Sequence, residues 1–317
     1  MIRRWLLSGV LAAILLAVTA GASAAFPGRP HEATVGVGGA VTNPQTYSLS
    51  QLGSLPQTTV TFTQHSWFGS RTYTDTGVSL EALVDDSVPT QLTPAPKNAL
   101  LRVTATVSGQ WAWPVTFALG ELDSGFGNRD ALLVLVQNHR TLAVPELVVP
   151  GDVNGTRTVL AVNRITVGVQ NPAPTTPPAG AVTIEDGPFT RTLSGAQLAA
   201  LPAETLSVSF MGPGGTQTHT EVGPTLADVL RAARLRFDLN TWVAAVGSDG
   251  YVATVTPAEA FVGGRPLQIS LNEDGTPLAQ PRLVTDGDVK GGRYVSGVVD
   301  LVVGQGAAPF YSRAWSR

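Results

Sequence analysis

The chain of 317 residues contains no cysteine. This absence excludes disulfide bonds, thiol nucleophiles, thiolate metal ligands and cysteine-held iron–sulfur clusters. Histidine is also scarce, because four histidines occur and none has the spacing of a metal site. We therefore expect no metal to be held by protein side chains alone, and a fold that is stable through burial without covalent cross-links.

Charged residues make up 14% of the chain, and the net charge is −3 at pH 7. Removing a predicted amino-terminal signal, which contains Arg3 and Arg4, leaves a net charge of −5. An acidic balance disfavours a nucleic-acid partner. The sequence has no G-x-S-x-G elbow and no glycine-rich phosphate loop, so two common classes of catalytic site are excluded. A small molecule or a protein remains open as the partner.

Long apolar runs are also lacking, with one exception at the amino terminus. Arg3 and Arg4 precede an apolar stretch at residues 5–18, and Ala22-Ser23-Ala24 resembles a signal-peptidase site. No other stretch approaches the length of about 20 apolar residues that spans a bilayer. We predict an export signal, a mature chain without a membrane span, and a periplasmic or secreted location, with the Sec and twin-arginine routes both open.

The chain does contain an internal duplication. Residues 145–168 and 281–304 share the pattern P-x-L-V-x-x-G-D-V-x-G-x-R-x-V at an offset of 136 residues. Solenoid repeats have periods of roughly 20–50 residues, so this offset indicates a duplicated domain. The predicted organisation is a signal peptide (1–24), a leader (25–33), unit one (34–170), a proline-rich linker (171–180), unit two (181–305) and a tail (306–317).

Glycine and proline are abundant, with 34 and 23 residues, and they accompany many short β-type segments. The sequence TTVTFTQ at residues 58–64 alternates with period two and predicts a strand. Leu80, Leu83 and Val84 share one face of a short helix that begins after Ser79. We therefore predict an α+β fold, in which mostly antiparallel or mixed sheets carry short helices.

Several motifs together resemble one known family. They are L-S-x-L-x-x-L-P at 49–56, G-V-S-L-x-x-L at 77–83, S-D-G-Y at 248–251, N-x-D-G-T-P-L at 272–278 and the P-R-L-V segment at 281–295. Their order resembles the molybdopterin-binding domain of the sulfite oxidase family, in its short bacterial form. The resemblance implies two tandem domains of that fold, unit one being a degenerate copy, and molybdopterin as a cofactor. Active members of the family use a cysteine to ligate molybdenum, which this chain cannot supply.

Five residues are candidates for cofactor binding. Arg157 and Arg293 follow matching Gly-Asp-Val-x-Gly loops, where a guanidinium suits a phosphate or a carboxylate. The alternative is that each arginine binds the aspartate of its own loop, such as Asp288, and stabilises the turn. Asp249 and Tyr251 lie at a predicted strand end, where they either orient a polar ligand or form a tight Asp-Gly turn.

A second group of residues is specific to unit one. His65, Trp67 and Arg71, joined by Trp111 and Trp113, form a polar and aromatic cluster that suits a flat ring or a sugar. The alternative is a hairpin tip with ordinary packing tryptophans. We predict either a ligand pocket or a partner surface at this cluster.

Three functions follow as hypotheses. The first is an exported, non-catalytic binding or scaffold module, because no cysteine is available to ligate molybdenum. The second is a molybdopterin-dependent oxidoreductase whose metal is held by the pterin dithiolene alone, with a phosphate pocket at the Arg293 loop. The third is a cell-surface interaction protein that presents the aromatic residues near Trp67 and Trp111.

Overall fold

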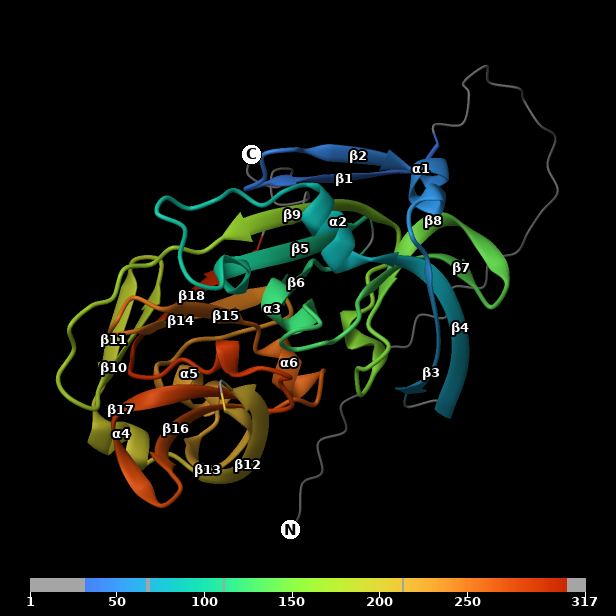
Figure 1. Cartoon of the computed structure of the whole chain (residues 1–317). Coiled ribbons are helices and arrows are strands. Elements are labelled where there is room, and N and C mark those ends of the chain that lie inside the picture. The colour runs from blue at the N-terminus through green and yellow to red at the C-terminus, as the bar shows by residue number, and fades with distance from the viewer. Residues whose placement is uncertain (1–31, 67–68, 111, 213, 307–317) are drawn as a thin grey trace, which may run out of the picture. The chain divides into compact units, whose positions relative to one another are not determined.

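The computed structural model describes residues 32–66, 69–110, 112–212 and 214–306 (Figure 1). The predicted signal peptide, most of the predicted leader and all but the first residue of the predicted tail lie outside these residues. No helix in the described part of the chain is long and apolar enough to cross a membrane.

The first repeat builds two sheets from residues 34–169. A five-stranded sheet has the order β2-β1-β9-β5-β6, and a four-stranded sheet has the order β3-β4-β7-β8. β1 and β9 pair in parallel, so the first strand closes against the last, and all other neighbours are antiparallel. The strands are β1 (Thr34–Gly39), β2 (Gln45–Ser48), β3 (Thr58–Ser66), β4 (Gly69–Ser79), β5 (Val103–Gly109), β6 (Val115–Ala118), β7 (Leu132–Gln137), β8 (Arg140–Val148) and β9 (Val162–Val169).

The second repeat has the same topology over residues 182–305. Its five-stranded sheet has the order β11-β10-β18-β14-β15, and its four-stranded sheet has the order β12-β13-β16-β17. β10 and β18 again form the parallel pair. The strands are β10 (Val182–Asp186), β11 (Phe189–Leu193), β12 (Ala203–Gly212), β13 (Gly215–Pro224), β14 (Thr241–Gly247), β15 (Val252–Val255), β16 (Leu267–Glu273), β17 (Thr276–Thr285) and β18 (Val298–Gln305).

The prediction of an α+β fold is wrong. The described residues are 50% strand and 16% helix, which is the character of a β-rich sandwich. Helical spacing of apolar residues does occur, as at Leu80, Leu83 and Val84, but the helices of the described chain run for only four to seven residues. One or two turns cannot form a helical layer. They are α1 (Leu49–Ser54), α2 (Leu80–Asp86), α3 (Leu119–Leu122), α4 (Gly195–Ala199), α5 (Leu226–Ala232) and α6 (Ala258–Phe261), with 3-10 turns η1 (Ala99–Arg102), η2 (Gly155–Arg157) and η3 (Gly291–Arg293).

Local chemistry explains several of these elements. Ser48 and Ser194 each form a capping box at the start of α1 and α4, with a glutamine three residues later. The segment TTVTFTQ lies in β3, where its threonines pair across to β4; Thr59 bonds Thr76 at 2.8 Å.

Each repeat has an apolar core, and the two cores share residues across the repeats. Leu101 of the first repeat belongs to the core of the second, and Leu239 of the second packs against the core of the first. Thr116 on β6 also donates its backbone N–H to the Leu239 carbonyl at 2.9 Å. All described residues belong to one compact unit. Loops of the two repeats are therefore held close enough to form shared cavities.

Candidate functional site

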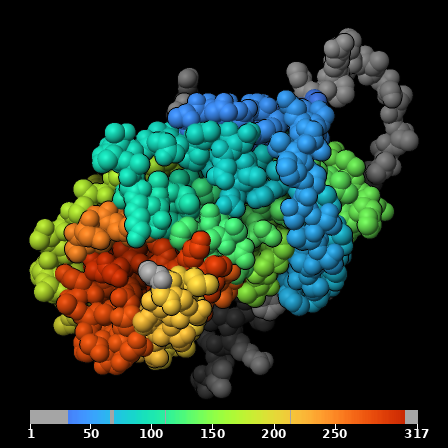
Figure 2. All heavy atoms as spheres, viewed as in Figure 1, coloured from blue at the N-terminus to red at the C-terminus, as the bar shows by residue number. Residues whose placement is uncertain are grey.

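A cavity with a volume of about 660 Å³ is lined by residues of both repeats. The second repeat contributes the end of β12, the turn between β14 and β15, and the loop around η3, while the first repeat contributes two loops. Figure 2 shows teal and green atoms of the first repeat against yellow to red atoms of the second on this face. Its lining is formed by Lys97, Asn98, Phe126, Phe210, Met211, Gly212, Asp249, Tyr251, Lys290, Gly291, Gly292, Tyr294 and Ser296.

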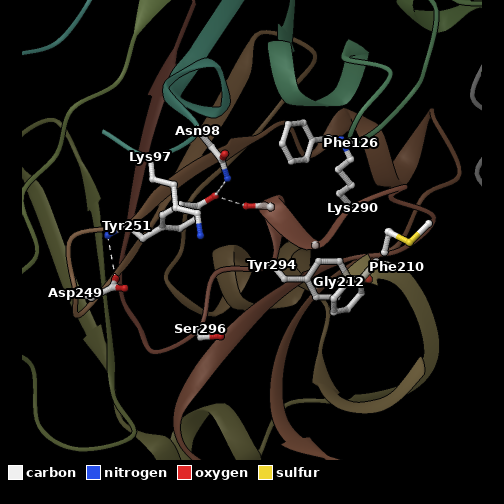
Figure 3. A pocket seen from close by; sticks show the side chains of 13 residues that line it. Lys97, Asn98, Phe126, Phe210, Gly212, Asp249, Tyr251, Lys290, Tyr294 and Ser296 are labelled. Atoms are coloured by element: carbon white, nitrogen blue, oxygen red, sulfur yellow. Dashed lines mark hydrogen bonds between the residues drawn. The ribbon is translucent and has the colours of Figure 1, made fainter. Parts of the chain in front are cut away.

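One wall is the turn that contains Asp249 and Tyr251, and a loop of the first repeat holds it (Figure 3). Asn98 donates its Nδ2 hydrogen to the Tyr251 hydroxyl at 2.9 Å, and that hydroxyl donates to the Gly292 carbonyl at 2.6 Å. Asp249 accepts the Tyr251 backbone N–H at 3.0 Å, as expected for a tight turn. Burial raises the pKa of Tyr251 above its usual value, although Asn98 opposes the shift. Tyr251 therefore stays protonated and positions the wall.

Two ammonium groups supply the charge of the cavity. Lys97 and Lys290 are the only lysines in the sequence, and both line this cavity. Neither forms a salt bridge within the described residues. Figure 3 shows Lys290 on the side of Phe126, whose carbonyl accepts the Val289 N–H at 2.8 Å, and Lys97 on the side of Tyr251. Two ammonium groups without a carboxylate partner raise the local concentration of anions.

Aromatic rings form the opposite wall. Phe210 and Tyr294 pack at a centroid distance of 4.4 Å. A Cβ at Gly291 would lie 2.6 Å from the Phe210 ring, and a Cβ at Gly292 would lie 2.2 Å from the ring of Phe126. The rings of Phe210 and Phe126 approach the backbone so closely that no side chain fits at Gly291 or Gly292. The wall therefore offers flat apolar surface between the lysines.

The two predicted cofactor arginines lie in the core and not in the cavity lining. Arg293 is 0% exposed. It donates from Nε and Nη2 to the Asp288 carboxylate at 2.9 and 2.6 Å, and from Nη1 to Glu259 at 2.6 Å. Arg157 repeats this arrangement with Asp152 and Glu121, at distances of 2.6 to 2.8 Å. The geometry is therefore that of the alternative interpretation, in which each arginine stabilises its own loop.

Glu121 and Glu259 were missed by the sequence analysis. Each is fully buried, on α3 and α6, and each completes one arginine cluster. Burial raises the pKa of Glu121 to about 7, although Arg157 opposes this shift. Their matching places in the two copies were the signal that could have found them. No such signal marks Lys97, Asn98 and Phe126, because these residues belong to the first repeat and line a cavity formed mainly by the second.

The described residues of the predicted polar and aromatic cluster lie at two separate places in the structure. His65 and Arg71 are exposed on the β3–β4 hairpin, where His65 Nδ1 lies 2.8 Å from the Ser70 hydroxyl. Trp67 and Trp111 lie outside the described residues. Trp113 is 82% exposed and lines a separate cavity of about 450 Å³, whose described lining includes neither His65 nor Arg71.

The residues of the large cavity fit part of the implied cofactor. Lys97 and Lys290 suit a phosphate, and the aromatic wall suits a pterin ring. The ligand set does not fit molybdenum, because the only sulfur in the described lining is the thioether of Met211 and no thiolate exists in the chain. The described residues also contain no group of three or more histidines or carboxylates arranged to hold a metal ion. No chemical step through a metal follows from these residues.

Comparisons with known proteins give little further support. No protein-family model matches the chain, and no curated protein is similar to it in sequence. Among solved structures, the chain is similar to the sulfane dehydrogenase SoxCD from Paracoccus pantotrophus, at 15% sequence identity and a TM-score of 0.35. The similarity covers 80% of this chain and 61% of that chain, which is less than two thirds of its length. A likeness this weak carries no argument about activity, and the family suggested by the sequence motifs stays a prediction.

Proposed function

We propose that this chain is an exported, non-catalytic binding module whose 660 Å³ cavity takes an organic anion with a planar ring. The observation that carries the proposal is the convergence of both lysines of the sequence on one aromatic-lined cavity. The volume lies within the range of about 300–1,000 Å³ found for small-molecule sites. Export rests on the sequence of residues 1–24 alone.

The choice of an anion follows from the charges around the cavity. The side chains of Lys97 and Lys290 are free of carboxylate partners within the described residues, whereas Asp249 accepts the backbone N–H of Tyr251. A ligand with a phosphate or sulfonate group neutralises the ammonium groups, and a planar ring packs on Phe210 and Tyr294.

The non-catalytic character rests on the state of the hydroxyl groups. Burial raises the pKa of both Tyr251 and Tyr294, so neither supplies a phenolate near neutral pH. The Tyr251 hydroxyl is also occupied by Asn98 and Gly292. The described lining contains no histidine or cysteine, so it lacks the imidazole base and the thiol of the common Ser–His and Cys–His pairs. These groups position a ligand and do not move a proton.

The test measures binding of neopterin monophosphate and unphosphorylated neopterin to the purified, full-length protein by calorimetry. We expect the phosphorylated probe to bind at least about tenfold more tightly. Lys97→Ala and Lys290→Ala should each weaken its binding by about tenfold, and raised salt should weaken it further. Arg140→Ala serves as the matched control, since Arg140 is exposed on β8 and does not line the cavity.

Two results would overturn the proposal. If the double lysine variant binds the phosphorylated probe as tightly as the parent, or if the parent does not bind it, the cavity is not an anion site. Molybdenum and pterin near one per chain, in protein from a molybdenum-supplied host, would instead favour the oxidoreductase hypothesis.

A further inference from the structure

The cavity around Trp113 is separate from the lysine cavity and shares no lining residue with it. Trp113 is 82% exposed, although tryptophan is among the most apolar side chains and is mostly buried in folded proteins. Pro114 and Leu239 continue the apolar surface beside the indole. The cavity has a volume of about 450 Å³, which is enough for a small ligand.

The floor of this cavity is held rigidly by both repeats. The Gly306 backbone N–H donates to the Asn240 carbonyl at 2.8 Å. The Thr116 hydroxyl donates to Asn240 Oδ1 at 2.8 Å, which orients the side-chain amide. A Cβ at Gly306 would lie 2.1 Å from the Thr106 hydroxyl, so the chain passes here without room for a side chain. The polar groups of the floor are therefore preorganised.

Three polar atoms of the residues that line the cavity with Trp113 have no hydrogen-bond partner among the described residues. Asn240 uses Oδ1 and leaves its Nδ2 donor free within the described residues. Asp238 uses Oδ1 for Asn240 N and the Thr241 hydroxyl, which leaves Oδ2 as an acceptor. Gln305 donates its Nε2 hydrogen to Thr241 at 2.8 Å and leaves Oε1 as a second acceptor. The residues that line the cavity beside Trp113 thus offer one donor and two acceptors.

We infer that this cavity is a carbohydrate-binding site. A pyranose ring has one apolar C–H face, which packs on an exposed indole such as that of Trp113, and hydroxyl groups that both donate and accept hydrogen bonds. Those hydroxyls match the free donor of Asn240 and the free acceptors of Asp238 and Gln305. No lysine or arginine is among the described residues that line the cavity, so a neutral sugar fits this lining better than an anion. The inference does not rest on the proposed anion site.

The experiment titrates the full-length protein with cellohexaose, chitohexaose and maltohexaose, followed by calorimetry. We expect at least one of the three to bind with a dissociation constant below about 1 mM, which is weak by general standards of affinity. Trp113→Ala should weaken that binding by at least about tenfold. Because Trp113 is exposed, this variant should unfold at the same temperature as the parent.

Two control variants make the outcome decisive. Phe261→Ala removes another exposed aromatic ring, 50% exposed and in a different cavity, and should leave sugar binding unchanged. Lys290→Ala should also leave it unchanged, which separates this site from the proposed anion site. Absence of binding by all three sugars, or equal binding by Trp113→Ala and the parent, would overturn the inference.

Discussion

Replacing Arg293 with methionine should destabilise the protein strongly. The Arg293 side chain is 0% exposed and donates three hydrogen bonds to Asp288 and Glu259. These two carboxylates are 3% and 0% exposed, so they have no water to replace the guanidinium. Removing one partner of a buried ion pair costs about 3–5 kcal/mol. That loss is a large part of the roughly 5–15 kcal/mol that stabilises a typical domain.

Urea denaturation at pH 7, followed by circular dichroism, gives the free energy of unfolding for each variant. The matched control is Arg231→Met, because the Arg231 side chain is 63% exposed and pairs with Asp228 at 2.9 Å. An exposed pair of this kind is worth under about 1 kcal/mol. A third variant combines Arg293→Met with Asp288→Asn and Glu259→Gln. It should be more stable than Arg293→Met alone, because no unpaired buried charge remains.

The result that refutes this reasoning is a small loss. If Arg293→Met costs no more than Arg231→Met, the guanidinium does not hold the η3 loop. The original prediction of a cofactor role for Arg293 would then regain support, and neopterin monophosphate binding by the variant would be the next measurement.

Two further predictions concern other buried groups. Asp75 is 0% exposed, and burial raises its pKa above 3.8, an effect that Gln137 opposes. The folded chain then holds a proton that the unfolded chain releases, so the free energy of unfolding falls as pH rises above about 4. Asp75→Asn should therefore be more stable than the parent at pH 7 and equal to it at pH 3 by urea denaturation, and a parent that gains stability over this interval would contradict the argument. Tyr251→Phe removes the hydrogen bonds to Asn98 and Gly292 and should cost about 1–3 kcal/mol, whereas Tyr73→Phe should cost less; equal losses would show that these two hydrogen bonds contribute little.

Features that depend on neighbouring residues could be predicted from the sequence. The duplication appears as two sets of sheets with one topology, because the same pattern recurs at an offset of 136 residues. The capped helix after Ser48 and the strand TTVTFTQ are present for the same reason. Arg293 binds Asp288 five residues earlier, an arrangement that the sequence analysis held open as the alternative to cofactor binding.

The fold class was predicted wrongly because local helical signals do not indicate what fraction of the whole fold is helical. The helix that contains Leu80 and Leu83 exists, yet it is only seven residues long. Strand pairing between distant segments accounts for most of the ordered backbone, and the parallel closure of β1 on β9 joins residues more than a hundred positions apart. Period-two patterns show that strands exist and do not specify their partners.

The sequence by itself determined the repeat, the capped turns and the absence of any thiolate ligand, because each depends on residue identity or on near neighbours. Tertiary structure alone decided that Lys97 and Lys290 share one cavity and that Asn98 holds Tyr251, 153 residues away. It also decided that Glu121 and Glu259 complete the arginine clusters. The first two contacts form only when the two folded repeats pack together, and the arginine clusters form only when distant segments of one repeat pack. Their free energy comes from that packing and from no local propensity.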